Sequence, residues 1–276
     1  MKIACNYYLE TEQLFDEGSI DLDYFKYPGE GFHMGIMDDL DVFEAFCDNL
    51  TAKRPILLHG VYPAPHDLAS PSLQANFNDK IVNRLIKITK TPGLSFHPTL
   101  SQLPNDVPFV KTLGTIIDNA VFIKEKYSDM DFVAIENVDT IRWGDLIKPE
   151  NITQLINETE CDFLLDIGHA FCASRAIGED FRTYLSKLPL QKVSEIHING
   201  WVETDNDIMG HLKINDLGYQ ILKELLNECS PQIITIEYGR DYDRIGLGCP
   251  LMAPDKINDD AKKEIVEQIS KIKKLV

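Results

Sequence analysis

The chain has 276 residues, of which 44% are hydrophobic and 26% are charged, and its formal net charge is −17 at pH 7. This composition is typical of a soluble globular protein, and the length fits one large α/β domain. Because so acidic a surface repels phosphate backbones, binding of nucleic acid is not expected. The sequence contains no apolar run long enough to span a membrane and no export signal at its N-terminus, so we expect no membrane association and a cytoplasmic location.

Short apolar runs rich in β-branched residues recur along the chain. They cover residues 2–6, 23–28, 56–60, 94–98, 132–137, 163–169, 193–200 and 233–239. Helical spacing is found between or beside them, over 12–17, 38–50, 79–90, 110–127, 219–230 and 262–275. Strands that alternate with helices favour a parallel sheet, and eight such units match the size of a (β/α)8 barrel.

The predicted fold class is therefore α/β, with residues 1–276 forming a single TIM-barrel domain. An open doubly wound sheet is the alternative. It is disfavoured because no glycine-rich phosphate-binding turn follows any of the predicted strands.

Side chains that can bind metals stand at or directly after the ends of six consecutive predicted strands. They are His59, His97, Glu136, Asp166, His169, His197 and Glu237, and His211 follows the seventh strand. Such barrels carry their chemistry at the C-terminal ends of the strands, so we expect these side chains to converge on one mouth. Each of them alone is more often a structural residue or a helix cap, and only the joint pattern indicates a site.

Carboxylates that converge in this way would repel one another and raise one another's pKa values, and divalent cations remove that conflict. Imidazole and carboxylate ligands without thiolate suit iron, manganese or zinc. One ion needs three or four protein ligands, so this larger set predicts two or three ions that share a bridging carboxylate.

Two further residues are expected to support the ligands. Glu195 lies two positions before His197 and shares its face of the strand, so it should orient that imidazole. Asn137, next to Glu136, is assigned a similar supporting role. Lys26, near the end of the second predicted strand, is expected to be solvated, and a position facing the barrel interior is the alternative.

Three residues are candidates for substrate binding. Trp201 follows the seventh strand and could either stack on a substrate at the mouth or pack inside the protein. Arg240 and Arg244 follow the eighth strand, where barrels often bind phosphate, and surface salt bridges are the alternative for both.

These motifs resemble the xylose-isomerase-like TIM-barrel superfamily over roughly residues 55–240. The resemblance rests on the runs LLHGVYPAP, SFHP, AIEN, LLDIGHAFCAS and IITIEYG. Three branches of the superfamily share motifs with this chain. Endonuclease IV is similar at the first four runs, and its three-metal site would fall on all eight ligand candidates. Where that family has an aspartate two residues before His211, this chain has Met209, which puts the third metal in doubt.

A second branch, the multinuclear non-heme iron-dependent oxidases, is similar at LLHGVY and IENV and from LLDIG through EIHINGW to IITIEYG. This resemblance implies oxidation of a peptide or thiol substrate, usually with a separate recognition partner protein. Members of that family often have asparagine where this chain has His169.

The third branch, the sugar isomerases and epimerases, would use Glu136, Asp166, His197 and Glu237 around one metal. Glu136 and Glu237 would then be the catalytic pair that transfers protons. We favour the oxidase, which makes iron the favoured metal, with the epimerase acting on a small-molecule sugar as the first alternative. In the favoured interpretation Glu136 bridges two ions, one held by His59 and His97 and the other by Asp166, His197 and Glu237. His169 and His211 are expected to complete a second or third ion. The endonuclease and an inactive barrel that binds a metal or a partner are further alternatives.

Overall fold

The structure is a computed structural model that describes residues 1–28, 35–103, 106–204, 208–239 and 257–276. Within these residues, eight parallel strands close into a barrel in the order β1-β10-β7-β6-β5-β4-β3-β2. Strand β1 pairs with both β10 and β2, which closes the ring. The predicted barrel is confirmed, and the open doubly wound sheet is wrong.

The eight barrel strands match the eight predicted runs to within a few residues. They are β1 (Lys2–Asn6), β2 (Tyr24–Pro28), β3 (Ile56–His59), β4 (Gly93–Phe96), β5 (Phe132–Glu136), β6 (Asp162–Asp166), β7 (Val193–Ile198) and β10 (Ile233–Ile236). A hairpin that was not predicted, formed by β8 (Gly200–Glu203) and β9 (Ile208–Leu212), lies between β7 and the next helix.

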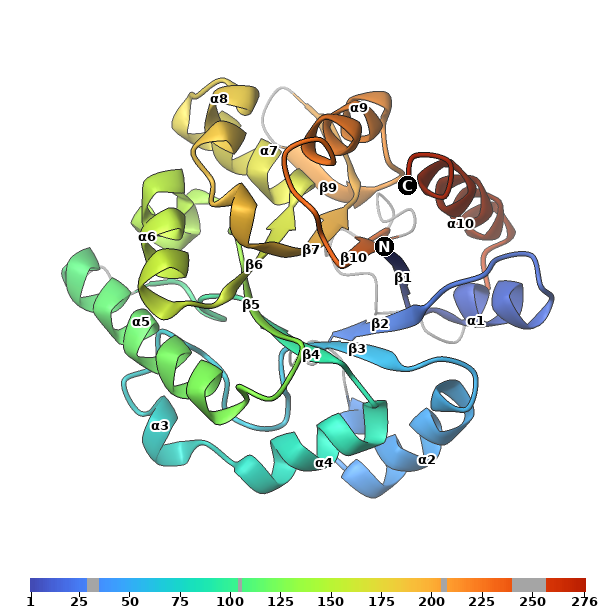
Figure 1. Ribbon diagram of the computed structural model, residues 1–276, viewed down its shortest axis with the longest axis horizontal. Coiled ribbons are helices and arrows are strands. Elements are labelled where there is room, and N and C mark those ends of the chain that lie inside the picture. The colour runs from blue at the N-terminus through green and yellow to red at the C-terminus, as the bar shows by residue number, and fades with distance from the viewer. Residues whose placement is uncertain (29–34, 104–105, 205–207, 240–256) are drawn as a thin grey trace.

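Helices surround the barrel (Figure 1). They are α1 (Leu9–Asp16), α2 (Leu40–Thr51), α3 (Leu73–Asn76), α4 (Asp79–Thr89), α5 (Phe109–Lys126), α6 (Pro149–Thr159), α7 (Ile167–Ile177), α8 (Phe181–Ser186), α9 (Asp216–Leu225) and α10 (Asp259–Ile272). Short 3-10 turns, η1 (Gly35–Met37), η2 (Ile141–Ile147) and η3 (Leu190–Lys192), complete the connections. In the described part of the chain, no helix is both long and apolar enough to cross a membrane.

The barrel has two separate sets of buried side chains, because alternate residues of a strand point to opposite faces. One set packs between the strands and the helices as the main core. The other set fills the N-terminal part of the barrel interior, and we call it the apolar plug. It consists of Ala4, Leu57, Phe132, Ala134, Leu164 and Ile233.

Two residues further along several of the same strands, the interior becomes polar. Leu57 is followed by His59 on β3, and Leu164 is followed by Asp166 on β6. Since the period of a strand is two, these polar side chains lie above the plug, toward the C-terminal ends of the strands. The fold therefore places polar groups where TIM-barrel enzymes carry their active sites.

Candidate metal centre

The first cluster of candidate ligands joins the ends of β3, β4 and β5. His59 Nε2 lies 2.9 Å and His97 Nε2 lies 2.6 Å from the same oxygen, Glu136 Oε2. His59 and Glu136 are buried, whereas the His97 side chain is 27% exposed. The three ligand atoms lie within 4.8 Å of one another, a spacing that fits one metal ion, and we call this cluster the first position.

The second position uses the other oxygen of the same carboxylate. His197 Nδ1 lies 3.3 Å from Glu136 Oε1, 3.2 Å from Glu237 Oε2 and 4.0 Å from Asp166 Oδ2. These four residues also offer ligand atoms within 4.8 Å of one another. Glu136 thus presents one oxygen to each position, which is the geometry that a bridging ligand requires.

His169 and His211 border the two positions. His169 Nδ1 lies 3.5 Å from Glu136 Oε1 and 3.0 Å from the carbonyl oxygen of Asn137. His211 Nδ1 lies 3.6 Å from Glu237 Oε2, and the two imidazole rings are 5.5 Å apart. Within the described residues neither histidine belongs to a cluster of ligand spacing, so their role at a further ion stays a prediction.

His211 lies on β9 with a φ of 55°, in the left-handed region that residues other than glycine rarely adopt. Its carbonyl oxygen accepts a hydrogen bond from the amide of Gly239 at 2.6 Å. Met209 lies two residues earlier on the same strand, where its backbone pairs with Val202. The hairpin therefore brings His211 to the centre, although no strands were expected there.

Asp166 is both a candidate ligand and a helix cap. Its Oδ1 accepts a hydrogen bond from the amide of His169 at the start of α7, while Oδ2 faces the second position. Asn137 holds the backbone of Asp166 by donating to its carbonyl oxygen at 3.0 Å and accepting from its amide at 2.8 Å. The supporting contact expected of Asn137 is thus made to Asp166.

Asn199 is a supporting residue that the sequence analysis missed. It is buried, its Nδ2 donates to Asp166 Oδ2 at 2.9 Å, and its Oδ1 accepts from the amide of His211 at 3.3 Å. A Cβ atom at Gly168 would lie only 2.1 Å from Asn199 Oδ1. The glycine of the DIGH run therefore leaves room for an amide that connects β6 to the hairpin.

Lys26 corrects another expectation, because it is buried in the barrel interior and is not solvated. Its side chain is 2% exposed, and its Nζ donates to Glu195 Oε1 at 2.9 Å and to Ser95 Oγ at 3.3 Å. Strand alternation directs it inward, and a buried carboxylate there balances its charge. Glu195 Oε1 also lies 3.1 Å from His197 Nε2, so the carboxylate contacts the imidazole it was expected to orient.

The electrostatics of the centre reflect crowded buried charges. Burial acts to raise the pKa of Glu136, but the nearby charges of His97 and His59 outweigh it and hold this pKa well below its usual value. Burial raises the pKa of Asp166 to about 8, despite the opposing charge of His169. The pKa of His169 rises to about 10, because Asp166 and Glu136 outweigh the effect of its burial.

The donor set fits divalent metal ions. Both oxygens of Glu136, Nδ1 of His197 and Oε2 of Glu237 are buried and have no hydrogen-bond partner in the described structure, although they lie at ion-pair distances from one another. Buried polar atoms without hydrogen bonds are costly, and metal coordination would satisfy them. Against the effect of burial, the carboxylates around them raise the pKa values of His169 and His197, and bound cations would take over the charge balance from those protons.

Of the three residues predicted to bind substrate, the structure describes only Trp201. Trp201 is 6% exposed and stacks on Phe171 with 4.5 Å between ring centroids, while Phe181 meets it edge-on at 6.0 Å. These contacts match the packing alternative for Trp201. Arg240 and Arg244 lie outside the described residues.

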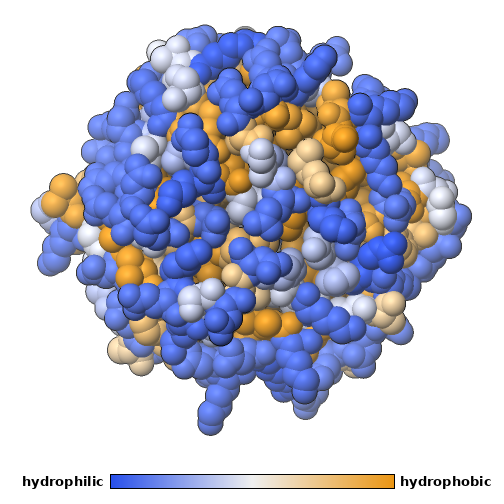
Figure 2. Space-filling view, viewed as in Figure 1, coloured by the Kyte–Doolittle hydropathy of each residue, from blue (hydrophilic) through white to orange (hydrophobic). Residues whose placement is uncertain are grey.

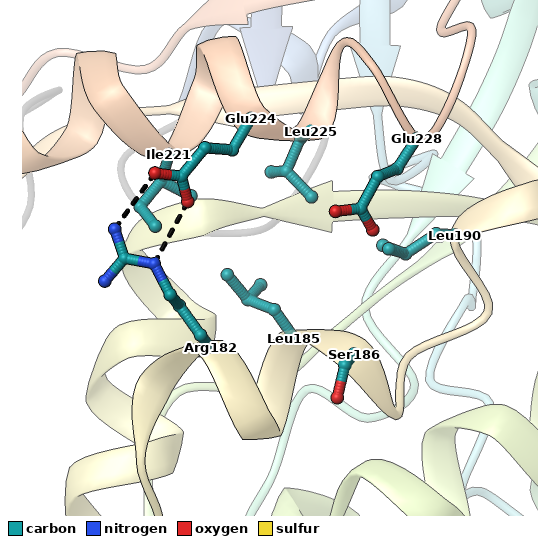
Figure 3. A pocket seen from close by; sticks show the side chains of 8 residues that line it. All are labelled: Arg182, Leu185, Ser186, Leu190, Ile221, Glu224, Leu225 and Glu228. Carbon is teal, nitrogen blue, oxygen red and sulfur yellow. Dashed lines mark hydrogen bonds and ion pairs between the residues drawn. The ribbon is translucent and has the colours of Figure 1, made fainter.

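A small pocket of about 100 Å³ lies between α8 and α9 (Figure 3). Arg182 and Glu224 form a bidentate ion pair at its edge. Nε of the arginine donates to Oε2 of the glutamate at 3.1 Å, and Nη2 donates to Oε1 at 3.0 Å. None of the residues that line the pocket belongs to the metal positions. The face of the molecule seen in Figure 2 is largely hydrophilic, in keeping with the net charge of −17.

Comparison of the sequence with known proteins shows the family to which the chain belongs. Residues 19–246 match the family model described as RiPP precursor modification enzyme MbnB/TglH/ChrH, where RiPP denotes a ribosomally synthesised and post-translationally modified peptide. A UPF0276 protein of Paraburkholderia phytofirmans is 30% identical over 203 residues, which cover 67% of this chain and 64% of that protein. The chain spans about three fifths of the length of the curated relatives that it matches.

Solved structures share the fold. The D-psicose 3-epimerase of Clostridium cellulolyticum H10 with D-tagatose has a TM-score of 0.65 at 11% identity, covering 100% of this chain and 99% of that one. A xylose isomerase domain protein of Alicyclobacillus acidocaldarius has a TM-score of 0.58 at 14% identity, covering 100% and 98%. These similarities confirm the predicted xylose-isomerase-like barrel.

Proposed function

Because the chain belongs to the family of RiPP precursor modification enzymes, we propose that it is a metal-dependent oxidase that modifies a cysteine-bearing peptide with dioxygen as the oxidant. The observation that carries the proposal is the shared carboxylate of Glu136, which lies between two clusters of ligand spacing. A separate recognition partner protein, implied by the family resemblance, would present the peptide.

Six residues would hold the two ions, and His169 and His211 stand beside them for a third. They are His59, His97, Glu136, Asp166, His197 and Glu237. Imidazole and carboxylate donors without thiolate suit iron, manganese or zinc. Iron is the favoured metal because the proposed reaction uses dioxygen. When bound, such ions polarise a substrate heteroatom and, if they are iron, allow dioxygen to react.

The two glutamates of the centre differ in access. The Glu136 side chain is fully buried, whereas the Glu237 side chain is 16% exposed. Glu237 is therefore the carboxylate that a substrate can reach from the mouth, and it accepts the proton that a thiol loses on binding. Glu136 keeps the two positions together from inside the barrel.

The experiment that tests this function is metal analysis of protein purified without oxygen, followed by reaction with cysteine-bearing peptides encoded beside the gene. We expect two or three iron ions per chain and a change in peptide mass that requires dioxygen. The double variant His59→Ala with His97→Ala should lose one ion. Protein that takes up no metal at all would refute the proposal and leave an inactive barrel.

A sugar epimerase is the second candidate, because the second position alone contains the complete ligand set that the resemblance assigns to that branch. Glu136 and Glu237 both contact His197 Nδ1 there, so they lie close enough to flank one substrate. One manganese or cobalt ion per chain, with activity on a free ketose, would favour it. Zinc with cleavage of an abasic duplex would instead favour the endonuclease.

A further inference from the structure

Lys26 lies beneath both metal positions, at the meeting point of two hydrogen-bond chains. We infer that Lys26 is a positioning residue that fixes the tautomers of His59 and His197, so that each imidazole turns one unprotonated nitrogen into the centre. This inference rests on the proposed metal centre and adds a residue outside its ligand set.

The first chain runs from Lys26 through Glu195 to His197. Lys26 Nζ lies 2.9 Å from Glu195 Oε1, and the same oxygen lies 3.1 Å from His197 Nε2. An ionised carboxylate only accepts hydrogen bonds, so Nε2 of His197 must carry a proton. Its Nδ1 is then free to act as a ligand, and that atom lies 3.2 Å from Glu237 and 3.3 Å from Glu136.

The second chain runs from Lys26 through Ser95 to His59. Ser95 Oγ lies 3.3 Å from Lys26 Nζ, 3.2 Å from the carbonyl oxygen of Leu58 and 2.9 Å from His59 Nδ1. The ammonium group only donates and the carbonyl only accepts, so we assign the single hydroxyl proton to the carbonyl of Leu58. The hydroxyl then accepts from His59 Nδ1, which leaves His59 Nε2 unprotonated and facing Glu136 at 2.9 Å.

Loss of the ammonium group would undo both assignments. Without a donor at position 26, the Ser95 hydroxyl can turn its proton toward His59 Nδ1, which favours the tautomer that cannot bind a metal through Nε2. Glu195 would also lose the cation beside it in a site where both partners are at most 2% exposed. A buried carboxylate left without its partner is destabilising, so the geometry of His197 would change as well.

The test uses zinc-loaded protein with ¹⁵N-labelled histidine, in which NMR shifts identify the protonated and the metal-bound nitrogen of each ring. We expect coordination through Nε2 of His59 and Nδ1 of His197 in the natural protein. Lys26→Met should give mixed tautomers and a zinc dissociation constant raised about 10- to 100-fold, as for other residues that orient ligands. Lys124→Met is the matched control, because Lys124 pairs with Asp162 at 3.0 Å away from the centre.

The double variant Lys26→Met with Glu195→Gln covers the case in which the single variant does not fold, since it removes both buried charges at similar volume. The amide oxygen introduced by Glu195→Gln can still accept from His197, so the defect should be confined to His59. Unchanged tautomers and affinity in a folded variant would overturn the inference while the metal centre stands. Natural protein that binds no zinc would refute the centre itself, and the inference with it.

Discussion

The interior of the barrel divides into two regions that use the same strands differently. Its N-terminal part holds the apolar plug, in which Leu164 and Ile233 are at most 2% exposed. Two residues further along the same strands stand Asp166 and Thr235, and here the interior contains imidazoles, carboxylates and one ammonium group. The strand period of two produces both regions, and only the side chains differ.

We expect the plug to supply the stability of the barrel and the polar region to supply its metal binding. The plug buries apolar surface, which is the main source of folding free energy. The polar region above it buries several charged groups, and the cost of removing them from water offsets their mutual attraction. Without a metal, this region therefore contributes little to the free energy of folding. A substitution in the plug should therefore leave metal affinity nearly unchanged, and a substitution in the polar region should leave stability nearly unchanged. Three substitutions test this separation.

The largest effect is expected for Glu136→Gln. The amide keeps the shape of the side chain but cannot bridge two cations, so metal binding at both positions should weaken by more than about 100-fold, beyond the loss typical of an orienting residue. The metal-free variant should still unfold cooperatively. Metal content measured by mass spectrometry checks this, with Glu224→Gln as the control, because Glu224 is 41% exposed and pairs with Arg182 away from the centre. A full metal complement would show that Glu136 is no bridge.

Leu164→Ala is the matching change in the plug. Removal of a fully buried leucine side chain should lower the free energy of unfolding by about 2–5 kcal/mol, because a cavity remains. Denaturant titration measures this, with Val110→Ala, whose parent side chain is 81% exposed, as the control. The metal affinity of the folded fraction should not change, and an equal fall in affinity would contradict the separation of the two regions.

Thr235→Val probes the boundary and should have the smallest effect. Thr235 Oγ1 donates to Glu195 Oε1 at 2.5 Å, and valine has the same shape without the hydroxyl. We expect a loss of about 0.5–1.5 kcal/mol in stability, because Lys26 and His197 still donate to that oxygen. Zinc affinity measured by calorimetry should fall less than about tenfold. If the loss of zinc-binding free energy exceeded the loss of unfolding free energy, Thr235 would belong to the polar region, and the boundary would lie below it.

The sequence could predict the ring of candidate ligands because two simple rules apply to it. Strand runs are recognisable from β-branched residues, and barrel chemistry lies where such runs end. His59, Glu136 and Asp166 follow these rules directly. Their division into two positions that share Glu136 was also expected, but which oxygen of Glu136 faces which imidazole could not be predicted from the strand ends.

Other features depended on contacts between distant segments. Lys26 looked like a solvated lysine because its partners Ser95 and Glu195 are 69 and 169 residues away in the chain. The β8–β9 hairpin was missed because its strands are short and each contains a glycine, and the residues that connect them are charged or polar. Asn199 carried no signal, since an asparagine after a strand is common in turns.

The contact between Gly168 and Asn199 has a consequence for how relatives of this protein should vary. Any side chain at position 168 would occupy the space of the Asn199 amide, so the two positions cannot change independently. Across an alignment of the family we expect them to covary, with a larger residue at 168 accompanied by a smaller one at 199. Relatives that keep both residues should keep the amide link from Asp166 to the hairpin that carries His211, so this pair can sort the family by the architecture of its centre.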